Sequence, residues 1–302
     1  MAQRTTVSLH SPGPNGQLRP LPGLAVSQVV GRLQAGYRQD APWAVASVAR
    51  LRREAGREVH VSPTAWGLDH LEKLADLREE RRSAEREARS AGTADLACFS
   101  SVAYVAREAQ ERREDTAVHL AVTLWALHQQ SLREDSMHQP GWPLGRAVRR
   151  LAHGRSGASD TPAAKDTEAG DTSESTSSDE KGSPAKTAMV EEASEAVRRR
   201  FVRVGSASDT EVLATRLREL VLLLRAARIP LDYARLADQL LQWQDENLQD
   251  TVRRTWGRDF HRRYPPAGGA SRTDDETAVG SVGSSVVLDD EAVGSEELDG
   301  DF

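Results

Sequence analysis

The sequence predicts an all-α protein, and two observations carry this prediction. Apolar residues recur every three or four positions through most of the chain, which is the pattern of amphipathic helices. No stretch alternates apolar and polar residues between turn signals, so strands are not expected. We expect two small helical-bundle domains, joined by a disordered acidic linker and followed by a disordered acidic C-terminal tail. The expected segments are a disordered N-terminus (1–20), an N-terminal helical domain (21–153), a flexible linker (154–189), a C-terminal helical domain (190–265) and the tail (266–302).

The N-terminal domain is expected to contain six helices, each based on apolar residues at helical spacing. A turn around Trp66 separates the second helix from the third. Thr116–Gln130 is apolar on nearly all sides, which predicts the central and most buried helix, capped by Asp115 or Thr116. Trp125 within it is expected to belong to the core. The six helices are Leu24–Ala35, Pro42–Arg57, Leu68–Arg89, Ala94–Ala106, Thr116–Gln130 and Leu144–His153.

The C-terminal domain is expected to contain four helices. Ser208 and Glu211 fit the S-x-x-E capping box at the start of the second one. Pro230 breaks the chain before the third helix, whose Trp243 is expected in the core, and Pro265 follows the fourth. The four helices are Val190–Val204, Ser208–Arg228, Leu231–Trp243 and Leu248–Tyr264.

Charge is divided unevenly along the chain. The whole sequence carries a net charge of −6, but Gly154–Met189 carries −3 and Ser271–Phe302 carries −9. The remainder is therefore mildly basic, at +6. Four of the 40 basic residues are lysines, and three of these lysines lie in the linker, so the segments expected to fold are rich in arginine. Arginine forks match phosphate oxygens two at a time, and a nucleic-acid backbone is a natural partner for them.

Four expected helices combine an apolar stripe on one side with arginines on the other. The last helix shows the pattern best, because its apolar residues recur every four positions from Leu248 to Tyr264 and its arginines fall on the opposite face. Such a face is often only solvated surface, but its repetition in four helices favours nucleic-acid binding. The candidate nucleic-acid-binding residues, which we expect to point away from the apolar stripes, are Arg50, Arg53, Arg57, Arg146, Arg149, Arg150, Arg199, Arg203, Arg254, Arg258 and Arg262.

Catalytic motifs are missing from the sequence. It has no phosphate-binding glycine loop, nucleophile elbow or H-E-x-x-H helix, so we expect no enzyme, no cofactor, no metal site and no small-molecule substrate. His119 and His128 are nine positions apart, and a structural role, such as bonding a nearby carbonyl, is expected for His128. The single cysteine, Cys98, fits a reducing cytoplasm, and no apolar run is long enough to span a bilayer.

Six sequence blocks in order resemble the CasB family, the small subunit of the type I-E CRISPR surveillance complex, Cascade. The resemblance extends over about Leu24–Tyr264 apart from the linker. The linker is longer and more acidic than is usual in the family, and the tail is an addition to the family pattern. The blocks are ARLRREAG (Ala49–Gly56), HLAVTLWALHQQS (His119–Ser131), PLGRAVRRLA (Pro143–Ala152), SEAVRRRFVRV (Ser194–Val204), LRELVLLLRAARIPLDYARLADQLLQWQ (Leu217–Gln244) and VRRTWGRDF (Val252–Phe260).

This resemblance implies a non-enzymatic all-α subunit, present in two copies in a crRNA-guided antiviral complex. Its implied partners are the backbone and large subunits, a second copy of itself, crRNA and target DNA. It would stabilise the R-loop by giving the displaced DNA strand a basic path, since the exchange of a DNA duplex for an RNA–DNA hybrid is nearly balanced in energy. Few aromatic residues lie among the arginines, which favours contacts to the backbone over base stacking.

Two other functions fit the same residues less well. A stand-alone helical adaptor would use its basic faces to bind acidic proteins. A transcription regulator would need a helix-turn-helix, which Leu217–Trp243 could mimic with Pro230 near the turn. The second helix of that pair carries one arginine, too few for a recognition helix.

Overall fold

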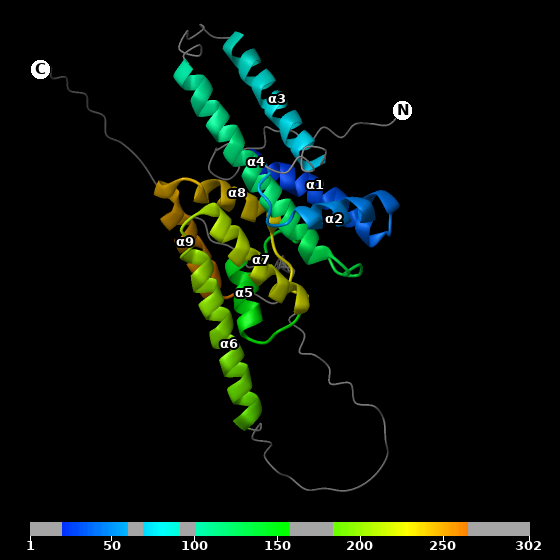
Figure 1. The fold of residues 1–302 in the computed structure, drawn as a ribbon, viewed down its shortest axis with the longest axis vertical. Helices are drawn as coiled ribbons and strands as arrows, with labels where there is room; N and C mark the ends of the chain where they lie inside the picture. The colour runs from blue at the N-terminus through cyan, green and yellow to red at the C-terminus, as the bar shows by residue number, and fades with distance from the viewer. Residues whose placement is uncertain (1–19, 60–68, 91–100, 158–183, 265–302) are drawn as a thin grey trace, which may run out of the picture. The chain divides into compact units, whose positions relative to one another are not determined.

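The protein is built from helices, which confirms the all-α prediction. The computed structural model describes residues 20–59, 69–90, 101–157 and 184–264. The expected tail, and most of the expected disordered N-terminus and linker, lie outside these ranges, as do Trp66 and Cys98. The described helices are α1 (Leu21–Arg38), α2 (Pro42–Glu54), α3 (Asp69–Ser90), α4 (Ser101–Gln129), α5 (Leu144–Ala152), α6 (Pro184–Gly205), α7 (Thr210–Ala226), α8 (Tyr233–Trp243) and α9 (Glu246–His261) (Figure 1).

The second half of α4 lies at the centre of the core, as its sequence predicts. Its side chains from Ala117 to Gln129 are buried, and Trp125 is fully buried. Helices α1, α2, α7 and α8 all pack against α4. Every side of this segment therefore meets another helix, which explains why it is apolar all round.

Helix α4 is longer than the sequence predicts, because it runs without a break from Ser101 through the charged stretch between the two expected helices. The expected cap at Asp115 or Thr116 is therefore wrong. Asp115 instead pairs with Arg78 of α3 at 2.8 Å, and the Thr116 hydroxyl donates a hydrogen bond to the Arg112 carbonyl at 2.9 Å.

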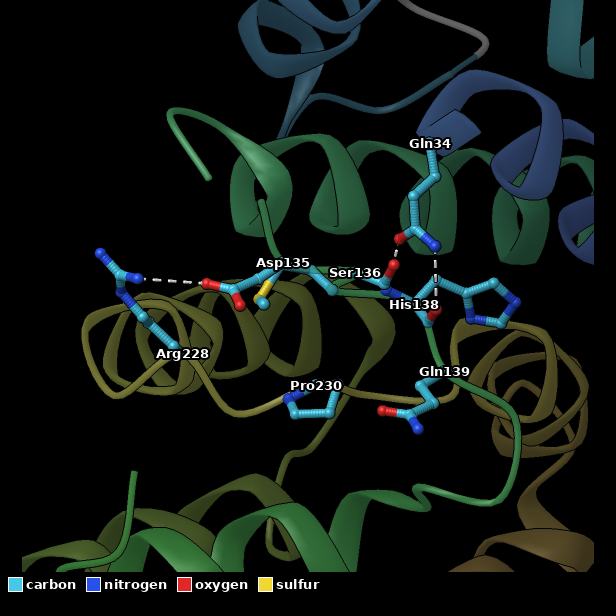
Figure 2. Close-up of a pocket in the computed structure, with 8 residues that line it drawn as sticks. Gln34, Asp135, Ser136, His138, Gln139, Arg228 and Pro230 are labelled. Atoms are coloured by element: carbon cyan, nitrogen blue, oxygen red, sulfur yellow. Dashed lines mark hydrogen bonds and ion pairs between the residues drawn. The ribbon is translucent and has the colours of Figure 1, made fainter. Parts of the chain in front are cut away.

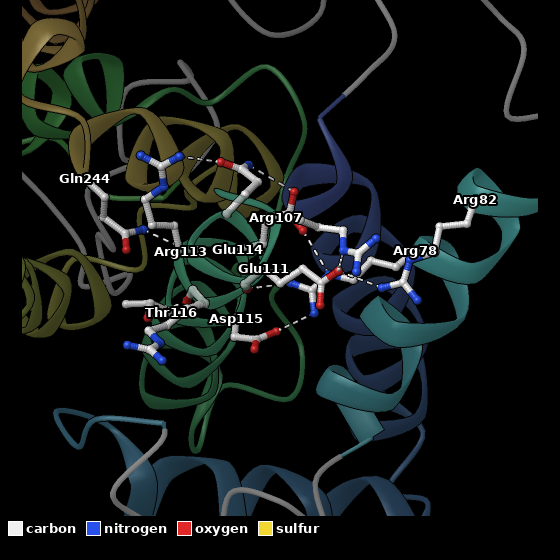
Figure 3. A network of polar contacts seen from close by, with 11 residues as sticks. Arg78, Arg82, Arg107, Glu111, Arg113, Glu114, Asp115, Thr116 and Gln244 are labelled. Carbon is white, nitrogen blue, oxygen red and sulfur yellow. Dashed lines mark hydrogen bonds and ion pairs between the residues drawn. The ribbon is translucent and has the colours of Figure 1, made fainter. Parts of the chain in front are cut away.

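The charged first half of α4 is held to α3 by ion pairs (Figure 3). Arg78 Nε lies 2.9 Å from a Glu114 oxygen, and both side chains are largely buried. One turn further along α3, Arg82 lies 2.6 Å from Glu111. The charges that look like a helix break in the sequence are therefore matched across two packed helices.

The C-terminal helices show two differences in their starting residues. Helix α6 begins at Pro184, so residues 184–189, expected as part of the linker, are helical. The N-cap of α7 is Asp209, whose carboxylate accepts a hydrogen bond from the Val212 amide at 2.8 Å. The capping box at Ser208 is therefore wrong by one position, and the Ser208 hydroxyl donates to the Asp209 carboxylate instead.

Helices from both ends of the chain pack together. Helix α8 contacts α1 and α4, and the Gly23 amide of α1 donates to the Asp238 carboxylate of α8 at 2.7 Å. All described residues fall within one compact unit, 1–267, and the expected boundary between two helical domains stays a prediction. No helix in the described part of the chain has both the length and the apolar character needed to cross a membrane.

Candidate nucleic-acid interface

The apolar stripe of α9 packs onto α8. Val252 and Trp256 are buried, and the Trp256 indole stacks on Trp243 with ring centroids 5.3 Å apart. The Trp256 indole N–H also donates to the Gln239 side chain at 2.8 Å. Leu248, in the first turn of α9, departs from the stripe because 41% of its surface is exposed.

The arginines on the opposite side of α9 face solvent, as the sequence predicts. Arg254, Arg258 and Arg262 are all exposed. Within the described residues, none of them has a carboxylate within ion-pair distance, and Arg258 Nε donates only to the Arg254 carbonyl, at 3.4 Å. This face therefore presents guanidinium groups that are available to an external anion.

The arginines of α5 do not face solvent in the expected way, and this part of the prediction is wrong. Arg149 donates hydrogen bonds from Nη1 to the carbonyls of Phe260 and His261, at 3.1 and 2.9 Å, where α9 ends. The Arg146 guanidinium lies 4.0 Å from the centroid of the Trp142 ring and 4.5 Å from that of Tyr264. Both side chains therefore bind the end of α9 to α5.

Arg150 is the third arginine of α5 and is the most deeply placed, with 9% of its surface exposed. Its guanidinium donates to the Ser156 carbonyl at 3.1 Å and so fixes the chain just after the helix. The close approach of α5 to α9 brings Arg149 within reach of the end of α9. A Cβ atom on Gly145 would lie only 2.4 Å from the Trp256 carbonyl oxygen and the Phe260 nitrogen.

The arginine face of α2 is open. Arg50 and Arg53 are exposed, and neither has a carboxylate within ion-pair distance among the described residues. Arg57 lies beyond the end of α2 and pairs with Glu54 at 3.7 Å. Trp43 lies on the same face and is 44% exposed, so the expectation of few aromatic residues among the arginines does not hold for α2.

The arginines of α6 are also exposed. Arg203 lies on its outer side together with Arg199, which makes one weak ion pair with Glu195 at 3.9 Å. Phe201 of α6 stacks on Phe260 of α9, with ring centroids 5.4 Å apart. The structure therefore brings the arginines of α6 and α9 onto neighbouring helices, whereas α2 packs on α1 and α4.

Several arginines elsewhere in the described residues are matched by acidic partners. The hairpin of α3 and α4 pairs its arginines with glutamates and aspartates, and Arg235 of α8 pairs with Asp259 at 2.8 Å. The pairing of Arg78 and Arg82 depends on tertiary contacts and is not visible in helical spacing, whereas Arg107 and Arg112 pair with glutamates four residues away on their own helix. The matched arginines of the hairpin are Arg78, Arg82, Arg86, Arg107 and Arg112.

The buried histidines have structural partners. His70 and His119 share a hydrogen bond of 3.1 Å, and burial, together with the neighbouring His119, lowers the pKa of His70 to about 3. His128 shares a hydrogen bond of 2.9 Å with the Tyr233 hydroxyl, and burial lowers its pKa to about 3 as well. In the part of the chain that the structure describes, no cluster of three or more His, Cys, Asp or Glu residues is arranged to hold a metal ion.

A shallow pocket lies between α1, the chain after α4 and the chain before α8 (Figure 2). Its polar groups already bind one another. The Gln34 side chain accepts from the His138 amide at 2.7 Å and donates to the His138 carbonyl at 3.1 Å, and Arg228 pairs with Asp135 at 3.3 Å. These contacts join the two chain segments, and the pocket offers no group poised for catalysis.

Comparison with known proteins identifies the family. The family model of CRISPR-associated protein Cse2 matches residues 47–261. The chain belongs to the Cse2 (CasB) family. The crystal structure of CasB from Thermobifida fusca is similar, with 35% sequence identity and a TM-score of 0.51 over 80% of this chain and 99% of that chain. No curated protein matches the sequence.

Membership in the Cse2 family makes the chain a structural subunit of the type I-E CRISPR complex Cascade. The match includes α4, α5, α6, α9 and the part of α2 from residue 47 onward, and therefore every candidate arginine except Arg262. The family match does not distinguish the open arginines from the matched ones, and the contacts described above supply that distinction.

Proposed function

We propose that this Cascade subunit binds the backbone of nucleic acid through the open arginines of α2, α6 and α9, and thereby stabilises the displaced DNA strand of the R-loop. The subunit performs no chemistry. Each phosphate that an arginine neutralises releases condensed counterions, which provides a favourable free energy that does not depend on base sequence. Because R-loop formation is nearly balanced in energy, a few such contacts change how long the open state persists.

The observation that carries this proposal is the difference between two sets of arginines. Those on the α3–α4 hairpin lie 2.5–4.0 Å from carboxylates, and their charge is largely neutralised locally. Those on the outer face of α9 have no carboxylate within that distance among the described residues. A surface that only needed solubility would gain from mixed charges, whereas an open cationic face attracts phosphate.

The partners proposed for this function follow the family. They are the backbone and large subunits of Cascade, a second copy of this subunit, the crRNA and the target DNA. The arginines of α5 are not proposed as nucleic-acid contacts, because they bind the protein's own carbonyls and aromatic rings.

Binding to a labelled single-stranded DNA of about 20 nucleotides tests the proposal. Replacing Arg254, Arg258 and Arg262 together by glutamine should reduce the slope of log affinity against log salt by about 2, at about 0.7 per lost phosphate contact, and weaken binding about 100-fold at 0.1 M salt. Glutamine retains helix propensity, so α9 should remain folded. In the assembled complex, the same variant should shorten the lifetime of the R-loop with little change in guide RNA binding.

A matched control replaces three ion-paired arginines of the hairpin, Arg82, Arg86 and Arg112, by glutamine. It changes the net charge by the same amount and leaves the α9 face intact, so affinity should fall by less than about threefold. Equal losses in the two variants would mean that net charge alone governs binding. An unchanged affinity and R-loop lifetime in the α9 variant would refute the proposal and favour the adaptor function.

A further inference from the structure

Trp43 is an exposed aromatic residue at the start of an arginine face. It is the second residue of α2, and 44% of its surface is accessible. Large aromatic side chains are usually buried in helical domains, and the other described tryptophans, Trp125, Trp142, Trp243 and Trp256, are all at most 3% exposed. The exposure of Trp43 therefore points to a role on the surface.

The position of the Trp43 ring is fixed by α1. Gly36 leaves space for the indole, since a Cβ atom there would lie 2.6 Å from Cζ2 of Trp43. The Arg32 guanidinium of α1 lies over the ring, 5.0 Å from its centroid. A ring held in this way loses little conformational entropy when a ligand stacks on it, and 44% of the surface of the residue remains accessible.

The charges around Trp43 are those of a site for an anionic ligand. Arg50 lies seven residues further along α2, which places it on the same face and about 10 Å away along the helix axis. Arg53 follows one turn later and is also exposed. Among the described residues, neither these two arginines nor Arg32 has a carboxylate within ion-pair distance. An aromatic ring followed by a row of cations fits a strand that carries both bases and phosphates.

We propose that Trp43 stacks a base of single-stranded nucleic acid, while Arg32, Arg50 and Arg53 bind the phosphates on either side. The inference rests on the proposed function, because it names the ligand of one of the open arginine faces and adds base stacking to the backbone contacts. A duplex keeps its bases stacked on one another, so this site selects the unpaired strand.

An abasic oligonucleotide separates stacking from charge, because it keeps every phosphate and lacks the bases. The wild-type protein should bind an ordinary single strand more tightly than an abasic strand of equal length. Trp43→Ala should weaken binding to the ordinary strand about tenfold and leave binding to the abasic strand and the salt slope unchanged. Arg50→Gln should weaken binding to both the ordinary and the abasic strand and reduce the slope of log affinity against log salt by about 0.7.

Tyr104→Ala is the matched control, since Tyr104 is 58% exposed and also lies under an arginine, Arg107, at 5.3 Å. It should bind both strands as the wild type does, and circular dichroism checks that each variant is folded. Equal affinity of wild type and Trp43→Ala for the ordinary strand would overturn the stacking site alone. A wild-type protein that binds neither strand would refute the proposed function as well.

Discussion

Arg149 should be a structural residue, even though its spacing in the sequence is that of a surface cation. Its Nη1 donates to the last two carbonyls of α9, at 3.1 and 2.9 Å. Carbonyls at the end of a helix lack partners within the helix, and a cation there also interacts favourably with the helix dipole. A partly exposed charged pair of hydrogen bonds and the dipole together contribute about 2 kcal/mol to the free energy of unfolding.

Arg149→Met keeps the length of the side chain and removes its donors. For a domain of this size, about 2 kcal/mol corresponds to a decrease in melting temperature of about 4–8 °C. Arg258→Met is the control, because Arg258 is exposed on α9 and its guanidinium donates only to the carbonyl of the preceding turn. That change should alter the melting temperature by less than about 2 °C. Thermal unfolding followed by circular dichroism measures both, and equal melting temperatures for the two variants would refute the structural role of Arg149.

Two further results are expected. Gly145→Ala places a methyl group 2.4 Å from the backbone of α9 and should lower the free energy of unfolding by about 3 kcal/mol. Gly257→Ala, which has open space around it, should raise the free energy of unfolding by about 0.5–1 kcal/mol. Urea titration compares the two variants, and an unchanged free energy of unfolding in Gly145→Ala would contradict the close packing of α5 on α9. Burial lowers the pKa of His70 and His128 to about 3, so below pH 6.5 the unfolded chain binds protons that the folded chain does not. The free energy of unfolding should therefore decrease by about 1.4 kcal/mol per pH unit per histidine as the pH falls to about 3. Urea titrations at pH 7, 6 and 5 measure this decrease, and a constant free energy of unfolding would contradict the prediction.

The sequence predicts the fold class and the centre of the core because both depend on local pattern. The apolar residues of Thr116–Gln130 leave no polar face, so the segment must be surrounded by other helices. The start of α4 could not be predicted in the same way. Residues 107–115 are almost entirely polar and read as a break, yet they are helical because their charges pair with Arg78 and Arg82 of α3. That pairing joins residues about 30 positions apart, which no local pattern records.

Local sequence patterns predict the candidate site less completely than they predict the fold. Helical spacing correctly predicts that Arg254 and Arg258 are exposed, because the apolar stripe of α9 fixes which side is buried. The same reasoning is wrong for Arg150, since its guanidinium binds the Ser156 carbonyl in the chain that follows α5. Trp43 was missed for a different reason. Tryptophan near a helix start usually belongs to the core, and only the tertiary structure, in which Trp43 is 44% exposed, shows that it lies on the surface.

Arginine therefore serves three purposes in this subunit, and the purposes follow from which backbone or side chain lies within reach. On the α3–α4 hairpin it meets carboxylates and holds two long helices together. On α5 it meets the carbonyls at the end of α9 and holds the C-terminal helices together. On the outer faces of α2, α6 and α9, arginine meets little or no acid among the described residues and keeps its charge for an external ligand. Net charge hides this division, because matched and open arginines count equally. Affinity for nucleic acid should follow the number of open arginines, since only these can exchange condensed counterions for a direct contact with phosphate.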